Sequence, residues 1–286
     1  MFVVLGASGH VGGELVRALL DSKREVLAIT HDPERAGRFV LDGAQAVPLD
    51  LREPERLRSV LQRGTRAFLL NPPAPISSDT DREEHKTVGA ILEALRDSSL
   101  QKVVLASTYG AQRGEGVGDL SVLFDFEQAL RDQSVPVSVL RSAYYMSNWD
   151  TMLAEVKNGI LPSMFPADFR LPMVAPKDVA SAAMELLLIP PEPFGVHHVE
   201  GPAAYTPAEV AQAFSTSLGR EVHLDVIPRD LWHQKYLEAG FSPEAARAYV
   251  RMTAVTIDQA TENPEVPLRG HTTLQMYIAD LVARSR

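Results

Sequence analysis

The stretch Gly6-Ala7-Ser8-Gly9-His10-Val11-Gly12 reads G-x-x-G-x-x-G and decides the fold of this chain. It follows an apolar run at residues 2–5 and opens an amphipathic segment at residues 10–20, so it joins a predicted strand to a predicted helix. In such a loop the backbone N–H groups and the helix dipole converge on one point, which suits a pyrophosphate. Gly6 permits the tight turn, Gly9 permits close approach of the phosphates, and Gly12 lets the helix pack on the strand. We therefore interpret the stretch as a dinucleotide-binding loop; a ligand-free turn is the alternative.

The chain around this loop alternates short apolar runs with segments of helical periodicity. Strands are predicted at residues 2–5, 25–29, 45–48, 66–70, 102–106 and 135–140, and helices at 10–20, 33–41, 53–62, 81–96 and 120–132. This alternation predicts a parallel sheet with right-handed crossovers. The strands are nearly continuous in Val, Leu and Ile, as expected when helices cover both faces. The sequence thus predicts an α/β fold with a doubly wound parallel sheet, the Rossmann architecture.

The regular alternation of strands and helices ends after residue 141, and this change divides the chain into two predicted parts. Residues 1–141 form the dinucleotide-binding domain, and residues 142–286 complete the sheet and form a small α/β substrate lobe over its carboxyl edge. In the second part, helices are predicted at 178–188, 207–218, 228–239, 243–258 and 272–284, and strands at 171–174, 197–200 and 221–226. Residues 142–159 suggest a loop and a helix, and residues 162–176 mostly a Pro-punctuated loop.

Composition excludes several classes of function. The 286 residues are 45% hydrophobic and 23% charged, which is typical of a globular protein with a real core. A net charge of −9 argues against nucleic-acid binding. The absence of cysteine excludes disulfides and thiolate nucleophiles, and no histidine spacing suggests a metal site. We expect a cytoplasmic protein with no secretory signal and no membrane span, acting on a small molecule; monomer and homodimer both stay open.

The end of the second strand bears on the cofactor's ribose. Asp32 lies where an acid could bond a 2′-hydroxyl, whereas His31, Arg35 and Arg38 offer positive charge for a 2′-phosphate. Asp32 also precedes Pro33, an arrangement typical of a helix N-cap, and we favour that role. We predict NADPH with a modest margin, and NADH is the alternative.

Three further strand ends supply candidate cofactor contacts. Asp50-Leu51 follows the third strand, where an adenine would lie, and Asn71-Pro72 ends the fourth strand and would face the middle of the cofactor. Ser107-Thr108-Tyr109 ends the fifth strand and would face the nicotinamide. Ligands of such folds bind outside the carboxyl ends of the strands, so the three segments together favour one site.

These segments, together with residues 140–148 (L-R-S-A-Y-Y-M-S-N), 174–180 (V-A-P-K-D-V-A) and 199–202 (V-E-G-P), resemble the NmrA-like family. This family is a branch of the atypical short-chain dehydrogenase/reductases. The resemblance spans essentially the whole chain. It implies NAD(P) binding, with relatives that include quinone and azo reductases, reductases of secondary metabolism and redox-sensing regulators.

Two departures from the family pattern matter. Relatives that bind NADP often carry Arg where this chain has His31, and the superfamily's catalytic Tyr-x-x-x-Lys pair is missing. None of the seven tyrosines has Lys four residues on, and the helix expected to carry the pair reads L-S-V-L-F-D-F-E at 120–127. The usual proton relay therefore cannot be transferred to this sequence.

Hydride transfer without that pair needs another arrangement of side chains. Tyr109 is the predicted proton donor, with Ser107 orienting the substrate; for Tyr109 a packing role is the alternative. We also predict an apolar pocket that accepts an aromatic ring. For about half of its predicted lining residues, packing in the core is the alternative. The predicted lining residues are Phe124, Phe126, Tyr144, Tyr145, Met146, Asn148, Trp149, Met152 and Met173. The leading hypothesis is an NAD(P)H-dependent reductase of a small aromatic or quinonoid compound. The alternative is a dinucleotide-sensing regulator that acts through a protein partner, and an epimerase is set aside because it needs the missing pair.

Overall fold

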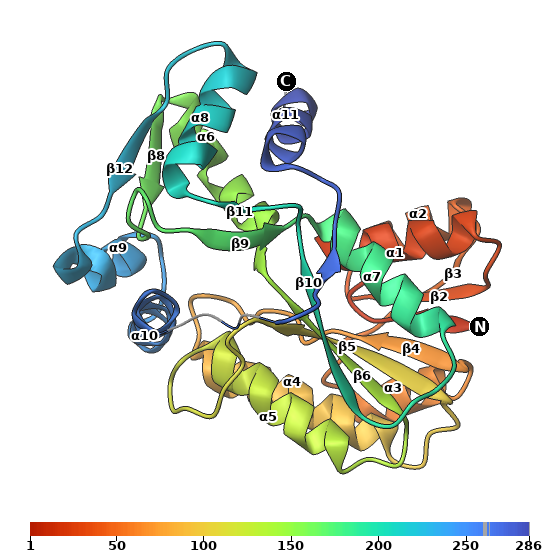
Figure 1. The fold of residues 1–286 in the computed structure, drawn as a ribbon. Coiled ribbons are helices and arrows are strands. Elements are labelled where there is room, and N and C mark those ends of the chain that lie inside the picture. Colours follow the sequence, from red (N-terminus) through yellow and green to blue (C-terminus); the bar gives the residue numbers. More distant parts are fainter. Residues whose placement is uncertain (260–261, 263, 286) are drawn as a thin grey trace.

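The structure is a computed structural model that describes residues 1–259, 262 and 264–285. Its centre is a parallel sheet of eight strands in the order β13-β10-β6-β5-β4-β1-β2-β3 (Figure 1). The strands are β1 (Phe2–Val4), β2 (Val26–Thr30), β3 (Gln45–Pro48), β4 (Arg66–Leu69), β5 (Lys102–Thr108), β6 (Val137–Ser142), β10 (Gly195–Glu200) and β13 (Leu268–Arg269). The strand order reverses between β1 and β4, which is the switch point where such sheets bind ligands. The predicted doubly wound α/β fold is confirmed.

Helices cover both faces of the sheet (Figure 1). On one face lie α1 (His10–Asp21), α2 (Pro33–Leu41) and α7 (Pro176–Leu188), and on the other α3 (Pro54–Leu61), α4 (Thr80–Leu95) and α5 (Asp119–Arg131). Successive strand residues face opposite layers: Val3 packs with the core against α3, α4 and α5, and Val4 with the core against α1 and α7. This burial on both sides explains the continuous apolar runs in the sequence.

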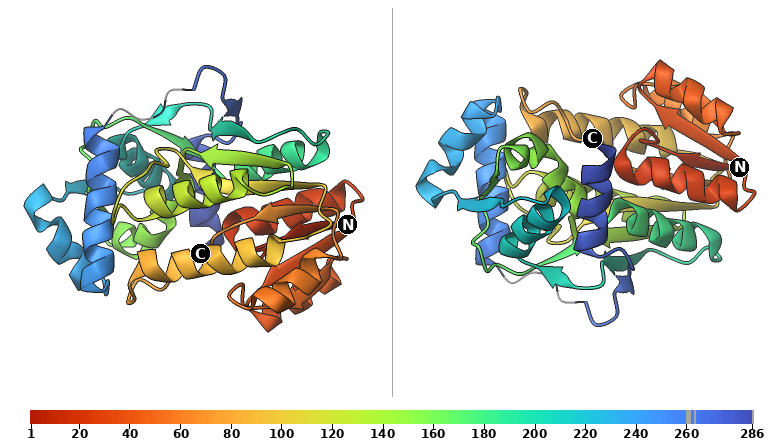
Figure 2. Two further views of the ribbon diagram at one scale, coloured as in Figure 1. Left: turned by 90° about the horizontal axis from the view of Figure 1, so that it is seen from below. Right: turned by 90° about the horizontal axis from the view of Figure 1, so that it is seen from above.

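The second half of the chain contributes to the sheet and builds a lobe above its carboxyl edge (Figure 2). Its strands outside the main sheet are β7 (Tyr144–Tyr145), β8 (Ile160–Ser163), β9 (Leu171–Val174), β11 (Ala204–Tyr205) and β12 (His223–Val226). Its other helices are the 3-10 turns η1 (Met146–Met152) and η2 (Arg229–Leu231), and α6 (Leu153–Lys157), α8 (Pro207–Leu218), α9 (Trp232–Glu238), α10 (Pro243–Asp258) and α11 (Leu274–Arg284). A third apolar core, separate from those under the sheet, holds this lobe together.

Several segments differ from the sequence prediction, among them the short strands β7, β11 and β13, which were not predicted. Residues 160–163 form β8 because they pair in parallel with β12, about sixty residues later in the chain. The local sequence gives no indication of that partner. The single helix predicted at 228–239 is a 3-10 turn followed by the short helix α9. Among the residues that the structure describes, we find no helix with the length and apolar character needed to cross a bilayer.

Candidate functional site

The glycine loop joins β1 to α1 in a turn that only glycine permits. Gly6 has φ +64°, in the left-handed region, and a Cβ on Gly12 would lie 2.2 Å from the Gly6 carbonyl oxygen. The Gly9 N–H donates to that same oxygen at 2.9 Å. Ala7 and Val11 are buried, while Gly9 and His10 are exposed. The loop therefore holds the start of α1 tightly against β1 and turns its exposed backbone toward the carboxyl edge of the sheet.

This loop fits the pyrophosphate of a dinucleotide. Gly9 is the N-cap of α1, and no side chain of the described residues caps the helix there. The first N–H groups of a twelve-residue helix, together with its dipole, are therefore left for an anion. A Cβ at Gly9 would meet the Gly6 oxygen at 3.3 Å, so even an alanine would crowd the turn.

Beside the loop, a groove of about 520 Å³ runs between α1 and α2, at the ribose end of the predicted site. It is lined by Ala7, Ser8, Gly9, Gly13, Val16, Arg17, Leu20, Asp21, Arg35, Arg38, Phe39 and Asp42. Arg35 Nη1 donates to the Ser8 carbonyl oxygen at 2.5 Å and so reaches across to the glycine loop. Asp32 caps α2, accepting from the backbone N–H groups of Glu34 and Arg35, as predicted from its place before Pro33. His31 is exposed at the end of β2.

The third and fourth strand ends lie along the same edge. Asp50 is held by Arg52, whose Nη2 lies 2.8 Å from Oδ2, and this hydrogen bond lowers the pKa of the Asp50 carboxyl. Leu51 is buried in the core beneath. Asn71 Oδ1 is a buried atom with no hydrogen-bond partner among the described residues, and Pro72 beside it is partly buried. Buried polar atoms normally find a partner, so Asn71 fits a site for a polar ligand next to the glycine loop.

At the end of β5, Ser107 belongs to a buried polar network. Its hydroxyl donates to Glu127 Oε1 of α5 at 2.5 Å, and Arg141 of β6 binds both oxygens of Glu127 at 2.7 and 2.9 Å. Ser107 and Arg141 are register partners, as are Arg141 and His198, so these side chains share one face of the sheet. Ser107 is only 3% exposed. The role of Ser107 in orienting the substrate stays a prediction, because in this structure its hydroxyl donates its hydrogen bond to Glu127.

Tyr109 is tied to the same end of the sheet by different partners. Its hydroxyl donates to Glu200 Oε1 at 3.0 Å, and Arg269 holds the other oxygen of Glu200 at 2.5 Å. Burial and the neighbouring Glu200 carboxylate raise the pKa of the Tyr109 phenol well above its usual range. Thr108 donates through Oγ1 to the Tyr109 carbonyl at 3.3 Å. The role of Tyr109 as proton donor stays a prediction, since this geometry holds its proton firmly on the phenol.

The predicted pocket-lining residues do not share one environment. Met146 and Trp149 are buried in the core of the lobe, together with Met173. Tyr144 and Tyr145 on β7 and Phe124 on α5 are partly buried, and Asn148 is exposed. Tyr144 packs edge-on against Phe165 at 5.5 Å between ring centroids. The partly buried tyrosines remain candidates for a substrate wall, and Phe126 is fully buried under the sheet.

Sequence reasoning missed a pair of carboxyl groups at this edge. Glu84 of α4, only 3% exposed, accepts from the Ala74 N–H at 3.0 Å and is hydrogen-bonded to Asp119, the first residue of α5. Burial, followed by the charge of Asp119, raises the pKa of Glu84 to about 9. A buried Glu within the apolar pattern of α4 is the one sequence signal that could have found this pair.

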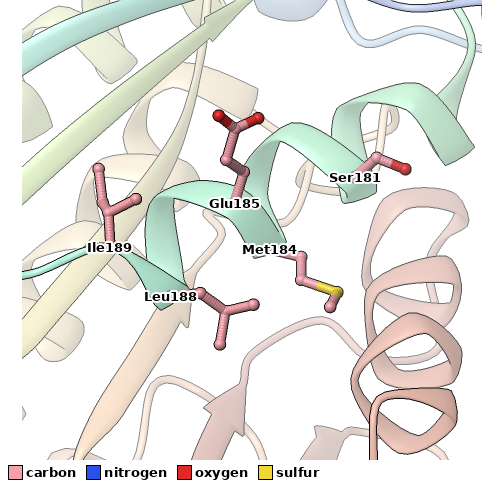
Figure 3. A pocket seen from close by; sticks show the side chains of 5 residues that line it. All are labelled: Ser181, Met184, Glu185, Leu188 and Ile189. Carbon is pink, nitrogen blue, oxygen red and sulfur yellow. The ribbon is translucent and has the colours of Figure 1, made fainter.

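A second hollow lies elsewhere, on the outer surface of α7. About 510 Å³ in volume, it is lined by Ser181, Met184, Glu185, Leu188 and Ile189, with Met184 and Leu188 on one side of the helix and Glu185 on the other (Figure 3). The Ile189 carbonyl accepts from Arg66, the first residue of β4. The hollow therefore lies toward the amino edge of the sheet, away from the glycine loop.

Comparison with known proteins finds relatives that match most of this chain. An NAD(P)H azoreductase from Xenophilus azovorans is 24% identical over 255 residues, which cover 89% of this chain and 87% of the relative. A (4-alkanoyl-5-oxo-2,5-dihydrofuran-3-yl)methyl phosphate reductase from Streptomyces griseus is 26% identical, covering 94% of this chain and 95% of the relative.

Solved structures share the fold. The triphenylmethane reductase of Citrobacter sp. superposes with a TM-score of 0.81 at 18% identity, over 99% of both chains. An NADPH-dependent quinone oxidoreductase from Escherichia coli, complexed with NADPH, has a TM-score of 0.79 at 18% identity, over 98% of this chain and 99% of that one. The model of the NmrA-like family matches residues 1–278. This chain belongs to the NmrA-like family.

Proposed function

We propose that this protein is an NAD(P)H-dependent reductase of a small apolar acceptor of the quinone, azo or aromatic-dye class. The observation that carries the proposal is the glycine loop, whose Gly6 oxygen would clash with any side chain at position 12 and whose helix start has no side-chain cap. The two relatives described above are named as an azoreductase and a reductase, which supports the reaction type. The partly buried Tyr144 and Tyr145 support an aromatic acceptor, because aromatic rings pack favourably against one another.

The residues present fit a nicotinamide dinucleotide. The loop from Gly6 to Gly12 would hold the pyrophosphate, and Asn71 would meet the cofactor beyond it with its unpartnered oxygen. When bound in its reduced form, such a cofactor supplies a hydride. This chain would position the cofactor and the acceptor and exclude water from them. The lobe above the carboxyl edge of the sheet is suited to cover the site in this way.

NADPH is the proposed cofactor, ahead of NADH. Arg35 spans from α2 to the Ser8 carbonyl, so its guanidinium lies where a 2′-phosphate would approach the loop. Asp32 is engaged as the cap of α2, which reduces its ability to bind a ribose hydroxyl. One relative is named for both NADH and NADPH, and one neighbour was solved with NADPH.

The direct test is the loss of nicotinamide absorbance when the purified protein is mixed with NADPH or NADH and a panel of quinones, azo compounds and triphenylmethane dyes. We expect oxidation with at least one class, faster with NADPH. The control is the Gly12→Ala variant, which should lose the reaction together with cofactor binding. No oxidation with any acceptor would contradict the proposal.

A dinucleotide sensor is the second candidate, and one observation favours it. Both hydroxyls predicted for catalysis are engaged inside the protein, Ser107 with Glu127 and Tyr109 with Glu200. A sensor must bind the oxidised and reduced cofactors with different affinities, because a ligand shifts a conformational equilibrium only through differential affinity. Calorimetric titration with NADPH, NADP, NADH and NAD measures those affinities, and equal values together with turnover would exclude the sensor.

A further inference from the structure

The buried carboxyl pair of Glu84 and Asp119 stands at the edge of the sheet where the substrate is expected. Glu84 is anchored to the backbone N–H of Ala74, three residues beyond Asn71 at the end of β4. Asp119 begins α5 at the end of the loop that leaves β5. The carboxyl ends of parallel strands lie along one edge, so the pair shares that edge with the glycine loop.

The pair carries a proton rather than two negative charges. Among the described ion pairs, none joins a lysine or arginine to Glu84 or Asp119. Two hydrogen-bonded carboxyl groups away from water cannot both ionise without a large cost. Burial raises the pKa of both carboxyl groups, so the hydrogen-bonded pair shares one proton. A proton is therefore held here at neutral pH.

Unpartnered polar atoms surround the pair. Thr80 is 2% exposed, lies one helical turn before Glu84 on the same buried face of α4, and its hydroxyl has no partner among the described residues. Asp81 Oδ1 is likewise buried and unpartnered there. Buried polar atoms of this kind normally bond to something. Their position points to a polar group of a ligand reaching the carboxyl pair.

Aromatic residues face the same place from two other elements. Burial, and to a smaller extent the charge of Asp119, raises the pKa of the phenols of Tyr145 on β7 and Tyr249 on α10. Tyr249 packs with Phe241 at 4.9 Å and with Tyr236 at 5.7 Å between ring centroids. An aromatic acceptor would thus meet rings and a carboxyl proton in one region.

We propose that the Glu84–Asp119 pair supplies the proton that completes the reduction, in place of the missing Tyr-x-x-x-Lys pair. The two carboxyl groups are hydrogen-bonded to each other, so the proton that they share passes from this pair to the acceptor. This inference rests on the proposed reductase function and names a proton source for it.

The step balances for an azo acceptor. The N=N bond receives a hydride, with two electrons, from the reduced nicotinamide cofactor on one nitrogen. The O–H bond of the carboxyl pair breaks, and its proton forms an N–H bond with the other nitrogen, giving HN–NH. The pair then regains its proton from water. A cationic triphenylmethane dye differs, because its central carbon needs only the hydride and becomes neutral without a proton.

This difference between acceptors gives the test. Asp119→Asn and Glu84→Gln keep the shape of the side chains and remove the proton source; Asp125→Asn, on the exposed side of α5, is the matched control. With NADPH, we expect both pair variants to lower kcat for an azo compound by about 100-fold, the lower range of general acid catalysis. Reduction of the cationic dye and the Kd of NADPH should stay within twofold of wild type, as should every value for the control.

A second readout is independent of turnover. A carboxyl that stays protonated absorbs in the infrared as a C=O stretch, separate from that of a carboxylate. We expect this band at pH 7.5 in the wild-type protein with NADP bound, and its loss in Glu84→Gln. The groups that face the pair and could shift its titration are Asp81 of α4, Tyr145 of β7, and Tyr249 and Arg251 of α10.

The negative results of these experiments contradict different parts of the proposal. Absence of the infrared band overturns the proton source whatever the activity. Equal loss of azo and dye reduction in Asp119→Asn, or azo reduction that both variants retain, also overturns it while leaving the reductase function standing. A wild-type protein that reduces the dye alone contradicts this inference, and one that reduces neither contradicts the reductase function itself.

Discussion

Gly12 and Gly37 are both helical glycines, yet a side chain at each would meet different surroundings. A Cβ on Gly12 would lie 2.2 Å from the Gly6 oxygen and 2.9 Å from Ala7 Cα, whereas one on Gly37 would meet nothing within 4 Å. We predict that Gly12→Ala destabilises the fold by about 1–3 kcal/mol, because backbone must move, and weakens NADPH binding at least tenfold. Gly37→Ala should stabilise α2 by up to about 1 kcal/mol.

Urea unfolding and cofactor titration of the two variants measure these effects. The comparison isolates the loop, since both changes add the same methyl group to a helix. Wild-type affinity in Gly12→Ala would mean that the close approach of helix and loop has nothing to do with the cofactor.

Arg35 decides the predicted cofactor preference. Its guanidinium is exposed and bonds the Ser8 carbonyl, so a 2′-phosphate can reach it without displacing a buried partner. We predict that Arg35→Ala weakens NADPH by about 1–2 kcal/mol, the scale of a charge-assisted hydrogen bond, and changes NADH by much less. Arg24→Ala, which removes the same charge just before β2 at the opposite edge of the sheet, serves as the control. If calorimetry shows that Arg35→Ala weakens the binding of NADPH and NADH equally, Arg35 stabilises the glycine loop and does not select the cofactor.

At the scale of elements, Glu127 links α5 to β5 and β6. It is 1% exposed and bonds Ser107 and Arg141. Removal of one partner from a buried ion pair leaves the other charge uncompensated, which costs about 3–5 kcal/mol. We therefore predict that Glu127→Gln lowers the free energy of unfolding in urea by about this amount. The surface change Asp125→Asn should lower it by less than about 0.5 kcal/mol. A loss below 1 kcal/mol would show that the network contributes little.

How far the sequence predicts an element depends on where its determinants lie. The helices α2, α8 and α10 begin where predicted, because Asp32, Thr206 and Ser242 cap their N-termini next to a proline. The glycine loop was predictable for the same reason, since all its residues are contiguous. The strand β8 was not, because its partner β12 is remote in the sequence.

The polar partners in the site were unpredictable for a related reason. Ser107 and Glu127 are twenty residues apart, and Tyr109 and Glu200 are ninety-one apart. Neither spacing belongs to one helix or one turn, so only the packing of α5 and β10 on the sheet brings these groups together. The sequence therefore predicts which residues reach the carboxyl edge but not which of them bond one another.

For the whole molecule, Glu84 makes stability depend on pH. Its pKa is about 9 in the fold against an ordinary value of 4.5, so the fold binds more protons than the unfolded chain between those values. Stability is accordingly full below the ordinary pKa and falls as pH rises toward 9. We predict that wild type loses roughly 2–4 kcal/mol more than Glu84→Gln between pH 5 and pH 9, at about 1.4 kcal/mol for each pKa unit before solvent relaxation.

The exposed change Glu93→Gln, on the same helix, should follow the wild-type curve. Urea unfolding at several pH values gives all three curves. Parallel curves for wild type and Glu84→Gln would mean that Glu84 is already ionised in the fold at neutral pH.

The claim that this member of the NmrA-like family is a reductase is tested most directly by a single turnover. The protein saturated with NADPH is mixed rapidly with an azo compound, a quinone or a cationic dye, and the absorbance of cofactor and acceptor is followed together. We expect both signals to fall at one rate and in equal amounts for at least one acceptor, and Gly12→Ala to give a smaller burst at the same NADPH concentration because less cofactor is bound. A bound cofactor that stays reduced with every acceptor, while NADPH and NADP bind with clearly different affinities, would contradict the reductase function and identify the protein as a sensor.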